Sequence, residues 1–262
     1  MARSAHPRPN PLAVAWSVLR ARRVKAPEPA GSLTVDHSAL APTLAAVRSP
    51  SRLAGVDVTQ LDWYLKAATD VEPDTLSRDE ALAFWINLYN ARAIRLALDA
   101  FSHGLTSVLR VPGAFDVRDL EVDGERLSLT DIEHGKIRRF RDSRVHGSLV
   151  CGSLSCPTLS LAPFSGAGIN RELDTQMRSF LGTGGAFADQ GDSTLYLSRI
   201  FLWYGADFVK PHRMPALIPA RRRQIASAVK PWMSPELAAW FDSARPRVVF
   251  QAYDWALGCG LS

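Results

Sequence analysis

SRDEALAFWINLYNARAIRLALDA, residues 77–100, contains the clearest helical pattern in the chain. Ser77 and Glu80 have the spacing of an N-terminal capping box, which predicts that a helix begins at residue 78. Apolar residues then cover most of the circumference, and a helix that is apolar on all sides is buried. We therefore expect a central helix over residues 78–100, around which the core is built.

Three polar residues interrupt this apolar surface. Glu80, Asn87 and Asn90 lie on one broad stripe of the expected helix, because they are separated by nearly whole turns. A buried amide must find hydrogen-bond partners or it costs free energy. The stripe either lines a pocket, where an asparagine orients a substrate or binds an oxyanion, or it holds the backbone of neighbouring loops, with Glu80 occupied by its capping box. Both interpretations remain open from the sequence.

The rest of the chain predicts helices in the first half and scattered strands in the second. Asp123-Gly124 is a hairpin-turn signal within residues 116–129, and Thr130 with Glu133 resembles a second capping box, which begins a helix ending near residue 140. Helices are also expected at 38–48, 58–69, 169–181, 215–229 and 235–243, strands in the segment around His146 and at 194–198 and 247–252, and a glycine-rich loop at 182–192. This pattern predicts an α+β fold, with the central buried helix packed on a small mixed or antiparallel sheet.

The composition is that of a chain with one substantial core, since 47% of the 262 residues are hydrophobic. Residues 1–34 are rich in Pro, Arg and Ala, so we expect a weakly ordered basic extension followed by a single domain over residues 35–262. The net charge is +5. Arginine-rich stretches occur without a nucleic-acid motif or interleaved aromatic residues, which favours a solvated basic face over a specific nucleic-acid partner.

The expected location is the cytoplasm. The apolar run at residues 12–19 is short and leads into Arg20-Ala21-Arg22-Arg23 rather than a cleavage site, which argues against a secretory signal. No segment approaches the roughly 20 apolar residues that span a bilayer, so no transmembrane segment is expected. An N-terminal amphipathic helix that touches a membrane is the alternative. Three cysteines exclude a disulfide-built scaffold.

RVHGSLVCGSLSCP, residues 144–157, places one imidazole and two thiols within a dozen residues. A thiolate is a competent nucleophile, and an adjacent imidazole is the usual means of ionising it. In a strand, Cys151 would point away from the face of His146, whereas Cys156 follows a Gly-Ser turn and is free to fold back. This geometry favours Cys156 as the nucleophile and His146 as its base, with Cys151 as the second candidate. The alternative is that Cys151 is a small buried hydrophobe and His146 a hydrogen-bonded core residue.

Two later segments set polar groups among bulky apolar residues. Tyr204 and Asp207 lie in IFLWYGADF (200–208), and Tyr253 begins a similar run, Tyr-Asp-Trp. A buried aspartate near a histidine orients it, as the third member of a triad does, so Asp207 is the candidate partner of the imidazole. More often such an aspartate caps a helix or accepts a hydrogen bond from Tyr or Trp.

Other chemistry has less support. A zinc site would draw on His134, His146, Cys151 and Cys156, but their spacings match no common zinc pattern. His134 is alternatively the imidazole that serves the thiols. Ser153 and Ser155 lack a G-x-S-x-G context, so serine catalysis is less supported. We expect neither a metal nor a cofactor.

Five segments in order resemble the family catalogued as domain of unknown function 547. They are FWINLYNA (84–91), LSLTDIEHGKIR (127–138), RVHGSLVCGSLSCP (144–157), LSRIFLWYGADF (197–208) and YDWAL (253–257). The resemblance covers roughly residues 36–258. The family has no established reaction, but some relatives are joined to glutaredoxin-like domains, which implies thiol chemistry. The motif positions that carry over are Asn87, Tyr89, Asn90, Glu133, His134, His146, Cys151, Ser153, Cys156, Tyr204, Asp207 and Tyr253. After Trp255 the chain departs from the family pattern, so Cys259 has no implied role.

The order of central helix, His146 and Asp207 is also similar to the papain and transglutaminase type of α+β fold. In that type a buried helix bearing the nucleophile packs on strands bearing a histidine and then an aspartate. Here Asn87 or Asn90 stands where a cysteine would be expected. The resemblance implies that the nucleophile is either lost or relocated to Cys151 or Cys156.

Two functions follow as expectations. The first is a cysteine-dependent hydrolase or acyl transferase, in which Cys156 or Cys151 is the nucleophile, His146 the base, Asp207 its partner, and Asn87 or Asn90 an orienting or oxyanion group. The second is a non-catalytic module that binds an unknown small molecule or peptide and whose polar motifs are structural. Tyr89, Asn90, Glu133, His134, Ser153, Tyr204 and Tyr253 are the candidate binding residues.

Overall fold

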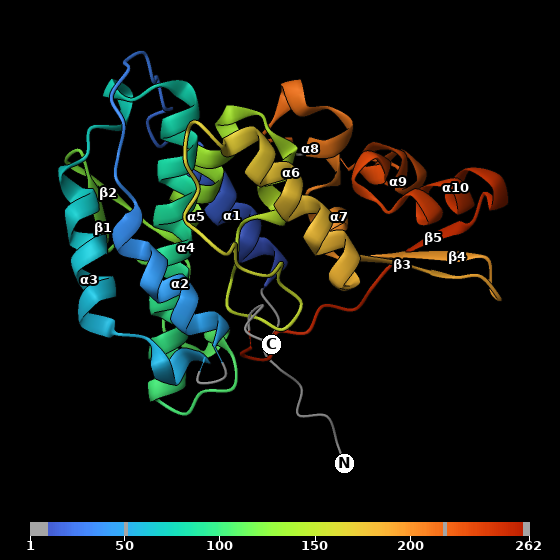
Figure 1. Ribbon diagram of the computed structural model, residues 1–262, viewed down its shortest axis with the longest axis horizontal. Coiled ribbons are helices and arrows are strands. Elements are labelled where there is room, and N and C mark those ends of the chain that lie inside the picture. The colour runs from blue at the N-terminus through green and yellow to red at the C-terminus, as the bar shows by residue number, and fades with distance from the viewer. Residues whose placement is uncertain (1–9, 50–51, 217–218, 259–262) are drawn as a thin grey trace. The chain divides into compact units, whose positions relative to one another are not determined.

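The computed structural model describes residues 10–49, 52–216 and 219–258. Its helices are α1 Pro11–Ala21, α2 Ala41–Arg48, α3 Val58–Ala67, α4 Arg78–Ser102, α5 Leu129–Asp131, α6 Ile169–Phe180, α7 Ile200–Trp203, α8 Gly205–Val209, α9 Arg222–Val229 and α10 Pro235–Ala244. Its strands are β1 Leu120–Val122, β2 Glu125–Leu127, β3 Ala186–Asp189, β4 Thr194–Leu197 and β5 Arg247–Phe250. Helices with two small sheets confirm the predicted α+β class (Figure 1).

The chain forms two compact units. Unit 1 comprises Met1–Arg139, Leu149–Ile169 and Asp254–Ser262, and unit 2 comprises Phe140–Ser148 and Asn170–Tyr253. Unit 1 contains α4 and the β1–β2 hairpin, and unit 2 contains the sheet β3–β4–β5. The expected weakly ordered extension includes residues 1–9, which lie outside the described residues, and α1, which contacts α5.

The central helix of unit 1 is α4, and its burial confirms the interpretation of the apolar pattern. Every residue from Glu80 to Ala91 is buried. Ser77 accepts the backbone N–H of Glu80, which fixes the first turn where it was predicted. Helix α3 lies beside α4 (Figure 1), and α5 and several short 3₁₀ segments also contact it.

The predicted hairpin is present and is shorter than its 116–129 window. Strands β1 and β2 pair antiparallel, and the turn residues Asp123 and Gly124 both have positive φ, at 50° and 70°. This is the backbone of a type I′ turn, whose twist matches that of the strands it joins.

The helix after the hairpin begins earlier than predicted. Its capping box is formed by Ser128 and Asp131, not by Thr130 and Glu133. Asp131 is fully buried and also accepts two hydrogen bonds from Arg118, at 2.7 and 3.1 Å. The carboxylate of Glu133 therefore takes no part in capping this helix.

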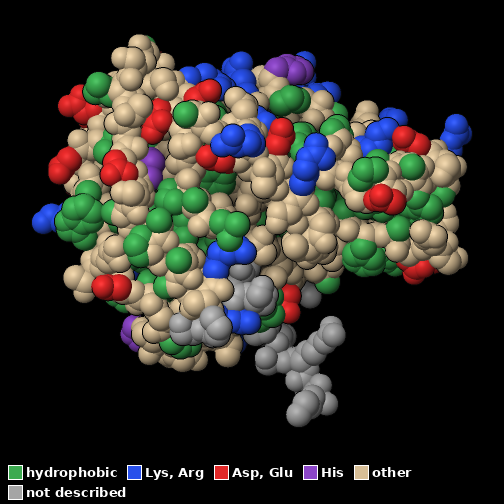
Figure 2. Space-filling view, in the orientation of Figure 1, with side chains coloured by type: hydrophobic (Ala, Val, Ile, Leu, Met, Phe, Trp, Pro, Cys, Tyr) green, Lys and Arg blue, Asp and Glu red, His purple; other side chains and the backbone are tan. Residues whose placement is uncertain are grey.

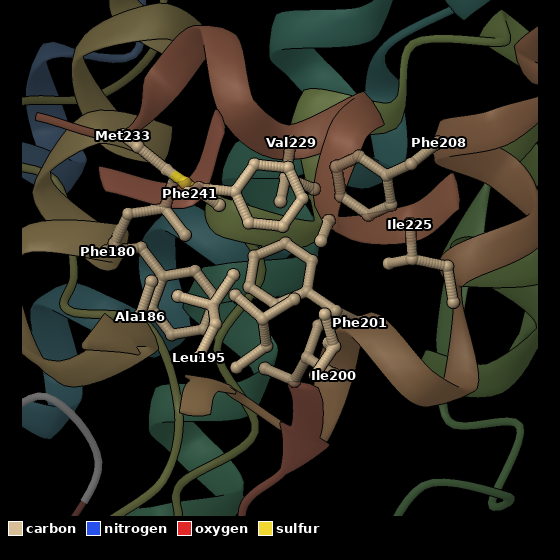
Figure 3. Close-up of a cluster of buried hydrophobic side chains, with 14 of the residues drawn as sticks. Phe180, Ala186, Leu195, Ile200, Phe201, Phe208, Ile225, Val229, Met233 and Phe241 are labelled. Atoms are coloured by element: carbon tan, nitrogen blue, oxygen red, sulfur yellow. The ribbon is translucent and has the colours of Figure 1, made fainter. Parts of the chain in front are cut away.

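Unit 2 is built on a mixed three-stranded sheet. Strand β4 pairs antiparallel with β3 and parallel with β5. A cluster of buried hydrophobic side chains forms the core of this unit, and within it Phe201 contacts both Phe180 and Phe208 at ring-centroid distances of 5.6 and 5.3 Å (Figure 3). Strand β3 lies where a glycine-rich loop was expected: Ala186–Asp189 pairs with the next strand, β4, across a short turn, and the glycines on either side obscure this hairpin in the sequence.

Two further predictions were wrong. Residues 144–150 do not form a strand; Ser143–Gly147 is a 3₁₀ segment, and Asp142 caps it by accepting the N–H of Arg144 at 3.0 Å. The helix expected at 215–229 is confined to α9, because Pro215 and Pro219 interrupt the earlier part. Residues 217–218 lie outside the described residues.

No helix among the described residues is long and apolar enough to cross a bilayer. On the face seen in Figure 2, acidic and basic side chains are interspersed rather than separated into one charged field.

Buried His37 predicts a pH-dependent stability. Its Nδ1 lies 2.8 Å from the Tyr64 hydroxyl, and burial lowers the pKa of the imidazole to about 4. Between about pH 6.5 and 4 the unfolded chain therefore binds more protons than the folded chain, so the free energy of unfolding falls as the pH falls. We expect a loss approaching about 3 kcal/mol, measured by urea denaturation across this range.

The control for this experiment is His103→Gln, at an exposed histidine. His37→Gln should flatten the pH dependence between pH 6.5 and 4, whereas His103→Gln should leave it unchanged. Equal pH dependence in His37→Gln and the wild type would show that other groups cause it.

Candidate functional site

Asn87 makes a reciprocal pair of hydrogen bonds with one loop residue. Its Nδ2 donates to the carbonyl oxygen of Phe164 at 2.8 Å, and its Oδ1 accepts the N–H of Phe164 at 2.9 Å. Both residues are buried. The side-chain amide thus reproduces the pairing that a backbone amide would make, and it holds the loop around Phe164 on α4.

Glu80 and Asn90 hold other loops in the same manner. The carboxylate of Glu80 accepts the N–H groups of Val35 at 3.2 Å and Gly166 at 2.9 Å, so it is not occupied by a capping box. Asn90 Oδ1 accepts the N–H of Val150 at 3.0 Å. These contacts support the second interpretation of the polar stripe, in which it organises loop backbone.

The residues that follow Val150 form a tight turn that brings Cys151 and Cys156 together. Gly152 has φ of 84°, and a Cβ there would lie 2.5 Å from a Val108 methyl carbon, so only glycine fits without rearrangement. Cys151 and Cys156 are partly exposed and not disulfide-bonded. We call residues 151–156 the cysteine loop.

Hydrogen bonds within the cysteine loop converge on the sulfur of Cys156. The N–H of Cys151 donates to this sulfur at 2.9 Å, and the hydroxyl of Ser153 donates to it at 3.5 Å. Cys151 Sγ lies 3.2 Å from the same hydroxyl oxygen. Because Ser153 has one hydroxyl hydrogen, the consistent arrangement runs from the Cys151 thiol to Ser153 and from Ser153 to Cys156.

The C-terminal motif lies beside the cysteine loop. Leu154 N–H donates to the carbonyl of Ala256 at 2.9 Å, and Asp254 N–H donates to the hydroxyl of Ser155 at 2.9 Å. Ser153 also forms an isolated bridge with Leu257. The sequence analysis did not propose Ser155 or Asp254 as site residues, although both lie in motifs that it quoted. Cys259 lies outside the described residues.

His146 and Asp207 form a buried pair in unit 2. His146 Nε2 lies 2.9 Å from Asp207 Oδ2, and their side chains are 1% and 0% exposed. Asp207 Oδ1 accepts the N–H of Ala216 at 2.8 Å. The Tyr204 ring stacks on the imidazole with a centroid distance of 4.0 Å and an interplanar angle of 17°.

This geometry is the one expected of an oriented imidazole. When Asp207 is ionised it accepts the proton on Nε2, so Nδ1 is the nitrogen with basic character. Asp207 was singled out from the sequence as the partner of His146, and the structure brings these two residues together. The cysteine loop belongs to unit 1 and the His146–Asp207 pair to unit 2.

The remaining candidate residues have local partners. Tyr89 donates its hydroxyl hydrogen to Glu133 at 3.3 Å. Buried His134 has its Nδ1 3.0 Å from Arg138 Nη1, a partner that sequence reasoning did not name. Tyr253 packs on Trp203 at a centroid distance of 4.8 Å. Within the described part of the chain, no three His, Cys, Asp or Glu side chains form a metal-binding group.

Comparison with known proteins supports the resemblance over part of its expected span. No curated protein and no solved structure matches the chain. Three of the five motifs, at 84–91, 127–138 and 144–157, lie within the stretch that a family model matches. Residues 73–181, from the turn before α4 to the end of α6, match the family described as protein of unknown function, DUF547.

Proposed function

We propose that the chain is a thiol-dependent enzyme of the hydrolase or acyl-transferase type, with Cys156 as its nucleophile. The observation that carries the proposal is the convergence of the Cys151 N–H and the Ser153 hydroxyl on the sulfur of Cys156. Hydrogen bonds donated to a thiolate favour the ionised form, which is the reactive form of cysteine. Cys151, whose sulfur lies against the Ser153 hydroxyl, is the second candidate.

His146, oriented by Asp207, is the proposed base. His146 would remove the proton of the Cys156 thiol, and the thiolate would attack an acyl carbon, form a thioester and expel the leaving group, which takes that proton from His146. Water or another acceptor would then attack the thioester while His146 removes its proton, and the C–S bond breaks to release Cys156, which recovers the proton. Asn90 contributes by holding the residue that precedes the cysteine loop, and Asn87 is reassigned from an oxyanion group to a positioning residue.

The test is the alkylation rate of each cysteine against pH, with iodoacetamide and mass-spectrometric assignment. We expect Cys156 to react with a midpoint clearly below the value of about 8.5 that a free thiol shows. Ser153→Ala removes one of the two donors, so it should raise this midpoint. Ser160→Ala, at a partly exposed serine whose hydroxyl donates to the carbonyl oxygen of Ala162, is the control. His146→Gln should slow turnover of the acyl-enzyme once a substrate is found.

A free-thiol profile for both Cys151 and Cys156 in the folded protein would contradict the proposal. Reaction of Cys151 as the more acidic thiol would instead transfer the nucleophilic role to it. Circular dichroism of each variant establishes that the fold is retained.

A second candidate function is a non-catalytic binding module. It is favoured by the polar stripe of α4, because Glu80, Asn87 and Asn90 all bind loop backbone. Polar motifs of this kind stabilise a scaffold without any chemistry. Ordinary reactivity of all three cysteines would favour this candidate, and the search would move to ligands and partners.

A further inference from the structure

Helix α1 presents an apolar face to solvent. Leu12, Trp16 and Leu19 are spaced four and three residues apart, so they lie on one side of the helix, and they are 80%, 65% and 49% exposed. Ser17 and Ala21, on the other side, are buried. Isolated exposed apolar residues are common, but three large ones aligned on one helix form a continuous surface.

The net positive charge of the sequence lies in the N-terminal segment that contains this helix. Residues 1–27 contain six Lys and Arg residues and no Asp or Glu, which leaves 25 Lys and Arg against 26 Asp and Glu in residues 28–262. The whole net positive charge therefore lies in the segment that contains α1. Arg22 and Arg23 follow the last turn of the helix and are exposed.

Two other basic residues here are already paired with acidic groups. Arg20 contacts Asp116 at 3.3 Å, and Lys25 contacts Asp74 at 2.8 Å. In the described part of the chain no ion pair involves the side chain of Arg22 or Arg23. These two guanidinium groups are thus available to an external anion, next to the apolar face.

We propose that α1 docks on an anionic lipid surface. An amphipathic helix with Trp and Leu on one face and Arg at its edge lies in the plane of a membrane interface, with the apolar side chains inserted below the head groups. The indole of Trp16 suits the boundary between head groups and acyl chains. The charge asymmetry of residues 1–27 selects an anionic surface over a neutral one.

The experiment is cosedimentation of the full chain with vesicles of phosphatidylglycerol and phosphatidylcholine, against vesicles of phosphatidylcholine alone. We expect binding to the anionic vesicles that weakens as salt is added. Trp16→Ser should lower the partition coefficient by about tenfold, because it removes the largest inserted side chain. Arg22→Gln with Arg23→Gln should lower it by about thirtyfold, at about 1 kcal/mol for each basic residue.

Matched control variants distinguish binding through α1 from nonspecific adsorption of the protein to vesicles. Trp63→Ser removes an equally exposed tryptophan from α3, and Arg110→Gln with Arg171→Gln removes the same charge at exposed positions elsewhere. Neither control should change binding. All these positions are exposed, so the variants should keep the wild-type circular dichroism, and bromolipid quenching lost in Trp16→Phe would report insertion directly.

Three outcomes would overturn the proposal. The first is absence of binding to anionic vesicles, and the second is a loss in Trp63→Ser that equals the loss in Trp16→Ser. The third is binding to duplex DNA or RNA that depends on Arg22 and Arg23 and competes with vesicles while Trp16→Ser has no effect, which would assign the segment to a nucleic-acid polyanion.

Discussion

Asp207→Ala is expected to lower the free energy of unfolding by about 3 kcal/mol or more, because it removes one partner of a fully buried pair. The substitution leaves the Nε2 hydrogen of His146 and the N–H of Ala216 without the acceptors that hold them at 2.9 and 2.8 Å. Unpaired buried donors lose their hydration without compensation. Urea denaturation followed by tryptophan fluorescence measures the loss.

Two further variants test whether the stability loss comes from breaking the buried His146–Asp207 pair. Asp242→Ala removes an exposed carboxylate of the same unit, paired with Lys230, and should cost no more than about 1 kcal/mol. Asp207→Asn keeps an oxygen acceptor and most of the shape, so its stability loss should be smaller than that of Asp207→Ala. If Asp207→Ala and Asp242→Ala cost the same, the buried pair does not stabilise the fold.

Asp207→Asn also tests the proposed chemistry. It disturbs the orientation and proton affinity of His146 with little change of volume. If His146 acts on Cys156, the alkylation profile of Cys156 should change in a variant that remains folded. An unchanged profile would confine the His146–Asp207 pair to a structural role.

Elements with strong local signals could be predicted from the sequence. Helix α4 has a capping residue and an unbroken apolar pattern, and the β1–β2 hairpin has the Asp-Gly turn that sets its backbone. The segment around His146 has no such signal. Its apolar composition is typical of a strand, but Asp142 and Asp174 bind Arg144 and stabilise a 3₁₀ segment instead. One of these two partners is 30 residues away in the chain.

The residues of the candidate site could also be predicted only where the signal is local in the sequence. The sequence indicated which residues are chemically unusual, and it identified Asp207 as a partner for His146. It could not identify the backbone partners of the polar stripe, because Asn87 and Asn90 bind loop residues 77 and 60 positions further along the chain. The strand that was part of the reason for preferring Cys156 is absent. The turn that was the other part is present at Gly152, and the N–H of Cys151 donates to the sulfur of Cys156.

Asn87→Leu is expected to destabilise the protein by about 2–4 kcal/mol. Leucine has a similar volume but neither donates nor accepts, so the N–H and the carbonyl of Phe164 both become unpaired in a buried position. Asn87→Asp retains the acceptor for the N–H and places a carboxylate against the carbonyl, so it should also destabilise. Urea denaturation measures both losses.

Asn90→Leu provides the comparison that separates scaffold from function. Asn90 holds Val150, which directly precedes the cysteine loop, whereas Asn87 holds Phe164 beyond it. Both substitutions should lower stability, but only Asn90→Leu should change the reactivity of Cys156, because it releases the backbone that directs the Cys151 N–H to the sulfur. A change of similar size in both variants would mean that thiol reactivity follows overall stability. An unchanged profile in Asn90→Leu would mean that the cysteine loop keeps its geometry without α4.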